Sequence, residues 1–533
     1  MKNRIEGETK MAKQYDVVVA GGGSNSLSAA AYLAKAGMSV CVLEKNEVIG
    51  GGLVCRELTV PGFKHEPHAT GLIIVMANPM IKNDELELKS RFGLRFFTPE
   101  KTIATVYDDE TWMSTCVSLD KTCESIAKFS NRDAEAYRAF VTRVIKMAPL
   151  LSGAMFKPPV PYGQFAMMLD QSPLGQELLR GMMMSCSAIL DELFENEKVK
   201  IHFMKWMGIF LLHPDERGTG LMFYSATAVA HTQEESGVYG GVQAFSDALG
   251  KCIEYHGGEI RTNTMVRKIL VSGGKATGVE LDTGEQILAR KAVIGCIHPH
   301  LLGDMVAGLD PDMVDEARRC ELSSHSGVMT HWALHEAPKY KCPEVNDALL
   351  VQPVPSKLAD LKQIFDDVGN GLMPKRLASI VAHMTVHDPS RAPAGKHTLY
   401  FFSFAPKILR DGGWTPAARD RVQEWMMQEY SKYCTNMGPE NIIAGMSESP
   451  ADQNEWSPSF AGGDFMGIGM FQHQLLGRRP TPRLAQYAVP GADGLYLTGP
   501  FMHPGGAVTG GGRATAMKIM EDLGMDSSKH MAL

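Results

Sequence analysis

The sequence lacks the features that define several common protein classes. It has ten cysteines but no C-x-x-C pair, so we expect neither a disulfide framework nor a structural zinc site, and we favour a reducing, cytoplasmic location. Residues 1–13 are polar and charged, without the apolar segment of a secretory signal. No stretch reaches the roughly 18 apolar residues of a membrane span, which leaves at most a peripheral membrane contact.

Clusters of one charge and common catalytic motifs are also absent. The formal net charge is −7 and no basic block occurs, so a nucleic-acid partner is not expected. There is no G-x-S-x-G motif and no combination of Ser, His and Asp that indicates a hydrolase. The pairs His65/His68 and His298/His300 resemble half of a metal site, but no carboxylate cluster or cysteine pair completes either one. We therefore expect no metal, and expect these histidines to bond to backbone or cofactor.

What the sequence does contain is glycine turns at the ends of apolar runs. Residues 15–44 read YDVVVAGGGSNSLSAAAYLAKAGMSVCVLE, the strand, glycine turn, helix and second strand of a dinucleotide-binding unit. Gly21 allows a tight turn, and Gly23 lets the backbone approach a pyrophosphate at the N-terminus of the helix. Glu44, at the tip of the second strand, is placed to bind ribose hydroxyls. Ser26 replaces the third motif glycine and is expected to pack the helix against the strand.

A second glycine cluster follows, and a third lies near the end of the chain. Gly51 and Gly52 keep side chains away from the phosphate and ribitol part of a cofactor, and Arg56 is predicted as a cation near the phosphates. Residues 491–524 again read as strand, glycine-rich turn and helix. Two such elements far apart in the sequence indicate one extended ligand held at both ends. FAD fits this better than NAD, because its flavin end needs backbone donors of its own.

The chain is too long for one compact core, so we expect two closely packed domains. The predicted fold class is α/β, with a Rossmann-like FAD-binding domain of three-layer β-β-α architecture and a discontinuous, mixed α+β substrate domain. The FAD-binding domain is predicted to comprise residues 14–90, 230–303 and 485–533. The substrate domain is predicted to comprise residues 91–229, mostly helical with a loop or lid, and 304–484.

The order of these motifs resembles the phytoene desaturase-like branch of the FAD-dependent amine oxidase and desaturase superfamily. The matching stretches are GGGSNSL, CVLEKNEVIGGG, LTVPGFKHEPHAT, YGGVQAFSDAL, TMVRKI with GKATGVELDTGE, and LYLTGPFMHPGGAVTGGGRATA. Family members typically carry G-A-G-x-N-G-L in the first stretch, from which Gly22 and Ser26 depart. Pro500 and Ala507 depart from the family pattern in the last stretch.

The resemblance implies FAD as cofactor, with Val266 meeting the adenine through its backbone. The cofactor-binding residues implied by the motifs are Gly21, Gly23, Ser24, Asn25, Ser26, Glu44, Lys45, Gly51, Gly52, Val266, Gly499, Pro500, Gly505, Gly506, Ala507 and Val508.

The expected activity is dehydrogenation of a C–C bond of a small apolar or alicyclic substrate by hydride transfer to flavin N5. His503, Tyr239 and His68 are the predicted candidates for a catalytic base, in that order. The electron acceptor would be oxygen or a quinone, because no second dinucleotide motif indicates NAD(P)H. The oligomeric state stays open, with a homo-oligomer as one alternative.

Three alternatives stay open at this stage. One is an amine or amino-acid oxidase, and another is an isomerase or saturase on the same scaffold. The third is a flavin-carrying binding or assembly protein without turnover. The methionine groups at 167–207 and 466–470 suit either an adaptable apolar pocket or ordinary core packing.

Overall fold

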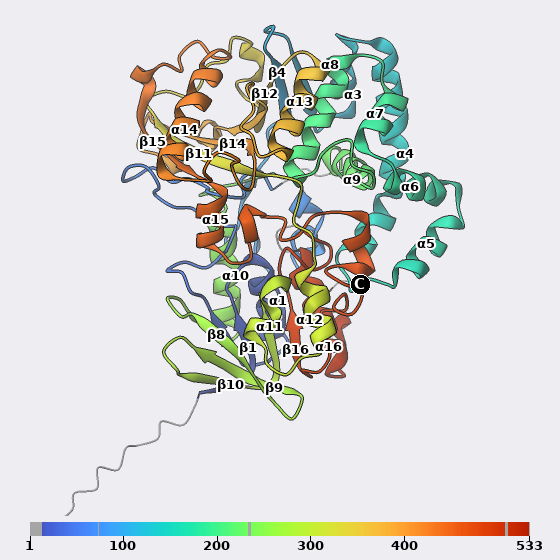
Figure 1. Ribbon diagram of the computed structural model, residues 1–533, viewed down its shortest axis with the longest axis vertical. Coiled ribbons are helices and arrows are strands. Elements are labelled where there is room, and N and C mark those ends of the chain that lie inside the picture. Colours follow the sequence, from blue (N-terminus) through green and yellow to red (C-terminus); the bar gives the residue numbers. More distant parts are fainter. Residues whose placement is uncertain (1–12, 73, 233–235, 507–509, 532–533) are drawn as a thin grey trace, which may run out of the picture.

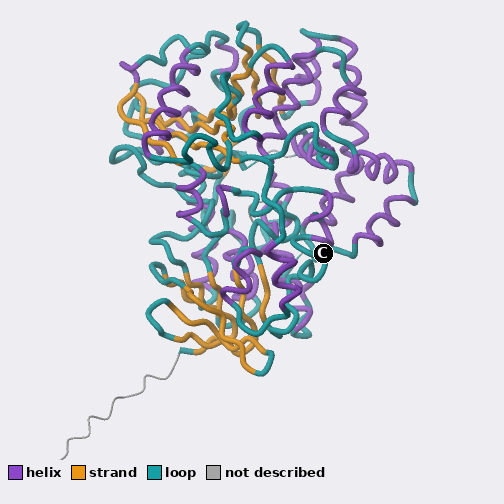
Figure 2. The backbone as a smooth tube through the Cα atoms, viewed as in Figure 1, coloured by secondary structure: helices purple, strands orange, loops and turns teal. Residues whose placement is uncertain are grey.

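Two seven-stranded sheets organise the protein. The structure, a computed structural model, describes residues 13–72, 74–232, 236–506 and 510–531. In Figure 1 the first sheet lies in the lower half and the second in the upper half, and Figure 2 shows the strands gathered in these two regions. Within the described residues, segments 14–90, 230–303 and 485–533 supply the strands of the first sheet, and segments 91–229 and 304–484 supply those of the second.

The first sheet is parallel in its centre. Its strands are β1 (Gln14–Ala20), β2 (Val40–Leu43), β7 (Glu259–Arg261), β8 (Val266–Ser272), β9 (Lys275–Leu281), β10 (Gln286–Gly295) and β16 (Leu495–Leu497). The order is β7-β2-β1-β10, all parallel. Along its other edge, β10 pairs first with β9, antiparallel, and then with β16, parallel. The sheet therefore splits here, and the β8–β9 hairpin supplies the second β layer expected from the sequence.

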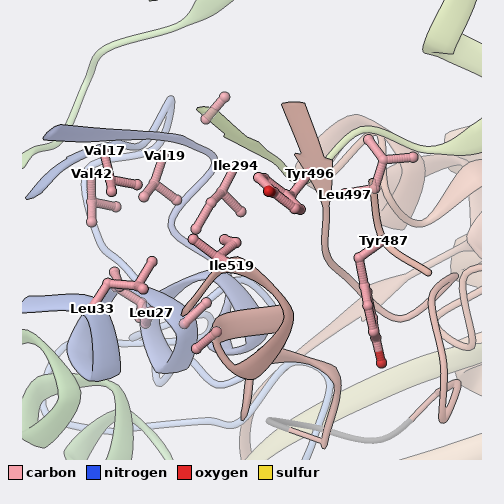
Figure 3. Close-up of a cluster of buried hydrophobic side chains, with 14 of the residues drawn as sticks. Val17, Val19, Leu27, Leu33, Val42, Ile294, Tyr487, Tyr496, Leu497 and Ile519 are labelled. Carbon is pink, nitrogen blue, oxygen red and sulfur yellow. The ribbon is translucent and has the colours of Figure 1, made fainter. Parts of the chain in front are cut away.

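Three helices cover one face of the parallel strands. They are α1 (Ser24–Lys35), α10 (Gln243–Tyr255) and α16 (Gly510–Asp522), with α1 in contact with both of the others. Figure 3 shows Val17, Val19 and Ile294 on the strands facing Leu27 and Ile519 on the helices. All five side chains are fully buried. The alternation of Val17 and Val19 places both on the face that α1 covers, and this burial stabilises the predicted strand-helix-strand unit.

The second sheet has the order β15-β11-β14-β13-β12-β4-β5. Its strands are β4 (Lys101–Tyr107), β5 (Trp112–Cys116), β11 (Ser326–Leu334), β12 (Leu350–Val354), β13 (Ser379–Ala382), β14 (His397–Ala405) and β15 (Ile442–Glu448). A separate two-stranded pair joins β3 (Phe96–Phe97) to β6 (Gly237–Val238). Segment 91–229, expected to be mostly helical, thus begins with strands, because β4 finds a parallel partner in the distant β12.

Helices lie on both faces of the second sheet. One face packs against the helical region formed by α3 (Leu119–Ala127), α4 (Asn131–Met155), α5 (Tyr162–Asp170), α6 (Pro173–Met183), α7 (Cys186–Leu193), α8 (Glu197–Met204), α9 (Gly220–Ala230) and α13 (Leu358–Gly369). The opposite face packs against α14 (Pro416–Ser431). The remaining helices are α2 (Pro79–Lys82), α11 (Leu302–Met305), α12 (Pro311–Arg318) and α15 (Pro450–Trp456). None of the helices in the described part is both long and apolar enough to cross a bilayer.

Candidate functional site

A cavity of about 1100 Å³ takes its lining from both sheets. This exceeds the roughly 300–1,000 Å³ of an ordinary ligand pocket, so the space can hold a large cofactor and a substrate together. One part is lined by the glycine turns and strand ends of the first sheet. The other part is lined by the helical region and by the second sheet.

The glycine turn after β1 forms the wall at the first part of the cavity. Gly21 has φ of 99°, a conformation that favours glycine, and its N–H donates to the carbonyl of Leu43 at 2.8 Å. Gly23 lies at the N-terminal end of α1, and a Cβ built there would meet nothing within 4 Å. Ser24 and Asn25, which begin α1, also line the cavity. The open space in front of Gly23 and the helix N-terminus fits a pyrophosphate.

Glu44 lies at the end of β2 and is 6% exposed. Its Oε2 accepts the N–H of Gly22 at 2.7 Å, and its Oε1 accepts the N–H of Asn46 at 2.9 Å. Burial raises the pKa of this carboxyl, whereas the two backbone donors act in the opposite direction. Lys45 and Val266 line the same end of the cavity, where the predicted adenine and ribose would lie.

The first turn of α1 is joined directly to the beginning of α16. The side-chain Oδ1 of Asn25 accepts the N–H of Gly511 at 3.0 Å and that of Gly512 at 3.3 Å. A Cβ at Gly512 would collide with the carbonyl oxygen of Asn25, so only glycine permits this approach. The two glycine-to-helix elements, 486 residues apart at this contact, thus converge as the sequence predicts.

The remaining predicted cofactor residues divide into three groups. Gly51, Gly52, Gly499, Pro500, Gly505 and Gly506 all line the cavity. Ser26 is fully buried in α1 and is not among the lining residues, so its position agrees with the packing role and not with a direct contact. Ala507 and Val508 lie outside the described residues.

Arg479 supports the loop that carries Gly499 to Gly506. It is fully buried, and its guanidinium donates to backbone carbonyls on two loops, those of Met466, Ile468, Gly469, Gln474, Pro500 and Met502. Burial lowers the pKa of Arg479 to about 10, so it stays charged at neutral pH. One cation therefore fixes the cofactor loop and the 466–474 loop, whose Met466 and Met470 also line the cavity.

The second part of the cavity is apolar. Its lining side chains come from the helical region, the second sheet and the 465–476 loop, and include Phe165, Trp206, Phe210, Leu221, Met222, Leu350, Ile380, Tyr400, Phe402 and Phe465. Of the predicted methionine groups, Met466 and Met470 belong to this wall, whereas Met167, Met168 and Met183 are exposed.

The three histidines that line the cavity differ in their bonding. His298 donates from Nε2 to the carbonyl of Gly467 at 2.7 Å, and its Nδ1 accepts the N–H of His300 at 3.2 Å. Both of its ring nitrogens are thus engaged in fixing loops. His503 is fully buried in the C-terminal loop. His68 is 7% exposed, and neither of its ring nitrogens has a hydrogen-bond partner among the described residues.

His68 lies where the two parts of the cavity meet. The neighbouring Ala69 donates its N–H to the carbonyl of Gly52 at 3.2 Å, on the glycine-lined side. On the apolar side, the hydroxyl of Tyr400 donates to the carbonyl of His68 at 3.2 Å. Burial, reinforced by the charge of Arg56, lowers the pKa of His68 to about 3. The ring is therefore neutral at physiological pH and keeps a lone pair available.

The structure does not place two of the predicted residues in the cavity lining. Tyr239 is 39% exposed, lies against Phe97 and Arg95, and is not among the lining residues. Arg56 does not line the cavity either. Its guanidinium stacks on the ring of Trp456 and pairs with Glu448.

Among the described residues, no group of three or more His, Cys, Asp or Glu side chains could hold a metal ion. The sequence does not predict the aromatic residues of the cavity wall. Phe460, Trp206 and Phe402 come from separate segments without a motif. The alternation of Tyr400 and Phe402 indicates that both side chains lie on the same face of a strand. It does not indicate whether that face lines a cavity.

Comparison with known proteins identifies the family. The sequence model of the family described as "Flavin containing amine oxidoreductase" matches residues 166–511, and that of the Thi4 family matches residues 1–57. One of the polypeptides of the limonene dehydrogenase of Castellaniella defragrans is 26% identical, with 96% of each chain covered. Phytoene desaturase (neurosporene-forming) of Rhodobacter capsulatus is 27% identical over 55% of each chain.

Solved structures show the same fold. A putrescine oxidase bound to putrescine has a TM-score of 0.60 and 16% identity, with 96% of this chain and 99% of the other covered. An oxidoreductase from Methanosarcina mazei has a TM-score of 0.60 and 17% identity, with 95% and 99% covered. The match to the family model extends over more than half of the chain. The protein therefore belongs to the flavin-containing amine oxidoreductase family, in its phytoene desaturase-like branch, and is an FAD-dependent oxidoreductase.

Proposed function

We propose that this enzyme removes two hydrogens from adjacent carbons of an uncharged apolar or alicyclic substrate. The observation that carries the proposal is the lining of the cavity: none of the described lining residues in 91–230 or 304–484 is charged. A substrate ammonium or carboxylate would lose its hydration there without gaining a partner. The names of the relatives, a limonene dehydrogenase and phytoene desaturases, agree with such a substrate.

Bound FAD supplies the acceptor for a hydride taken from the substrate. The protein's own contribution is mainly placement. The backbone around Gly23 and the N-terminal end of α1 would hold the phosphates, and Glu44 would bind the ribose. The loop fixed by Arg479 would hold the other end of the cofactor. The apolar wall would then position a substrate C–H bond and exclude water.

His68 is the residue that we assign as proton acceptor. It lies at the junction of the two parts of the cavity with both ring nitrogens unpartnered among the described residues, whereas the nitrogens of His298 already serve two loops. When the C–H bond next to the site of hydride loss breaks, its electron pair forms the C=C bond. The proton passes to a ring nitrogen of His68.

Two further proposals concern the electron acceptor and the location of the enzyme. Oxygen or a quinone would reoxidise the flavin, since the sequence carries no second dinucleotide motif. A cytoplasmic, reducing location fits the ten cysteines, all of which are free thiols in the structure.

Anaerobic reduction of the flavin is the direct test of the proposed function. We expect limonene or phytoene to bleach the flavin absorbance of the purified enzyme, and we expect putrescine and cyclohexylamine not to do so. Photoreduction in the same cuvette establishes that the flavin is competent. Bleaching by the amines alone would show an amine oxidase, and bleaching by none of a broad panel of apolar compounds would refute the dehydrogenase.

Replacement of His68 by asparagine tests the assigned proton acceptor. Loss of a positioned base costs about 10²- to 10⁴-fold, so we expect reduction by substrate to slow by at least about 100-fold. FAD content and the photoreduction rate should stay unchanged, because the His68 side chain makes no hydrogen bond to the described residues that would support the fold. Rapid-mixing absorbance measures the rate, and a decrease of less than about threefold would exclude His68 from this role.

A further inference from the structure

A second group of buried polar side chains lies beside His68, on the face of the second sheet that meets the cavity. In the strand register, Glu448 on β15 is opposite Met329 on β11, which is opposite Phe402 on β14. Directly paired residues point to the same face. Since Phe402 lines the cavity, Glu448 lies on the cavity-facing side of the sheet. Figure 1 shows these three strands adjacent in the upper part of the molecule.

The next row of the same face carries His331. It is opposite Tyr400, another cavity-lining residue, and residues two apart on a strand share a face. The His331 ring lies 5.4 Å from that of His65 and 5.7 Å from that of Tyr400, between centroids. His331 is fully buried, and neither of its ring nitrogens has a partner among the described residues.

Glu448 connects this interior group to the protein surface. Glu448 is 5% exposed, and its Oε2 has no hydrogen-bond partner within the described part of the chain. Its Oε1 lies 3.6 Å from the guanidinium of Arg56. The side chain of Arg56 is 34% exposed and stacks on Trp456, whose ring lies 6.2 Å from that of His68. A succession of contacts through Trp456 and Arg56 therefore joins the ring of His68 to the carboxyl of Glu448, and Arg56 is partly exposed to solvent.

We propose that Glu448 is the proton acceptor behind His68, and that the partly exposed Arg56 stabilises the ionised form of its buried carboxyl. This inference rests on the proposed function. The proton leaves the protonated His68 ring and passes to the Glu448 carboxylate, directly or through hydrogen-bonded water. His68 is thereby neutral again, and Glu448 becomes a neutral carboxylic acid that releases its proton to solvent beside Arg56. No electrons move in this step.

The electrostatics agree with the assignment. Burial raises the pKa of Glu448 to about 7, against the favourable charge of Arg56. The negative charge of Asp452 also raises the pKa of Glu448, and the positive charge of Arg419, like that of Arg56, lowers it. Burial keeps the rings of three nearby histidines, His65, His68 and His331, neutral. These rings therefore add no charge to the proton relay from His68 to Glu448. A histidine with a strongly lowered pKa holds a proton poorly, whereas a carboxyl near pH 7 both accepts and releases one.

The resting holoenzyme allows a test without substrate. Infrared difference spectra between low and high pH should show a protonated carboxyl band that titrates near pH 7 and is lost in Glu448→Gln. In Arg56→Gln the same band should titrate at higher pH, because the carboxylate loses a favourable charge. Glu455→Gln, an exposed residue on the adjacent α15, is the matched control and should leave the band unchanged. Absence of a titrating band removed by Glu448→Gln would overturn the proposal.

The pH dependence of substrate-driven flavin reduction tests the relay itself. In the wild type the rate should rise with pH through about 7, as Glu448 ionises. We expect Glu448→Gln to be about 10-fold slower or more at pH 8 and to lose this limb, and Arg56→Gln to shift the limb to higher pH. Unchanged FAD content and photoreduction would exclude a merely structural effect. A normal rate and limb in Glu448→Gln would overturn the relay alone, whereas a wild type that no apolar substrate reduces would refute the proposed function and the relay with it.

Discussion

Replacement of Gly23 by valine is expected to yield a folded but colourless protein. Gly23 has φ of −70° and ψ of 161°, an extended conformation that valine adopts readily, and its built Cβ meets no protein atom within 4 Å. The fold should therefore tolerate the side chain. The branched methyl groups would instead occupy the space in front of α1 where the pyrophosphate must approach. A loss of at least about 3 kcal/mol corresponds to more than about 100-fold weaker FAD binding.

Flavin absorbance of the purified protein and titration with added FAD measure this effect, and circular dichroism establishes that the variant is folded. Gly369→Val is the matched control, because Gly369 is exposed at the end of α13, and its built Cβ also meets nothing within 4 Å. Wild-type FAD affinity in Gly23→Val would mean that the dinucleotide does not approach this turn.

The cofactor end of the site could be predicted because its signals are local in the sequence. Gly21, Gly23 and Glu44 belong to one strand-helix-strand unit, and the chemistry of each depends on neighbours within that unit. The second glycine loop could be added by the same logic. The convergence of α1 and α16 could also be expected, because both glycine turns were predicted to hold the same ligand. The hydrogen bonds from Gly511 and Gly512 to Asn25 could not be predicted.

The proton-handling residues could not be predicted, because their positions depend on contacts between distant segments. Glu448 faces the cavity only because β15 pairs with β11 in one particular register, and a shift by one residue would place it on the α14 side. Arg56 follows a glycine cluster, a position typical of a phosphate ligand, but its partner is this distant carboxylate. Tyr239 likewise precedes a glycine turn, but it directly follows β6, which pairs with the distant β3, and its side chain is exposed.

No motif in the sequence indicates that Arg479 is buried or that it holds two loops together. Its replacement should nevertheless have one of the largest effects on stability and on FAD binding. Arg479→Met leaves carbonyls of the 466–474 and 499–506 loops without their shared donor. Buried acceptors left unsatisfied cost about 1–3 kcal/mol each before the loops rearrange. We expect the free energy of unfolding to fall by roughly 3 kcal/mol or more. We also expect the purified protein to lose most of its FAD, because the loop that carries Gly505 and Gly506 would no longer be fixed.

Chemical denaturation of the wild type and the variant, both stripped of flavin, separates the effect on the fold from the effect of the cofactor. Arg478→Met is the matched control: it removes the same charge one residue earlier, from a side chain that is only half-buried and stacks on Tyr162. Arg479→Lys should recover part of the stability, because an ammonium has only three donors for six carbonyls. If Arg479→Met kept both its unfolding free energy and its FAD, the two loops would have to be held independently, and a single buried cation would not couple the substrate wall to the cofactor loop.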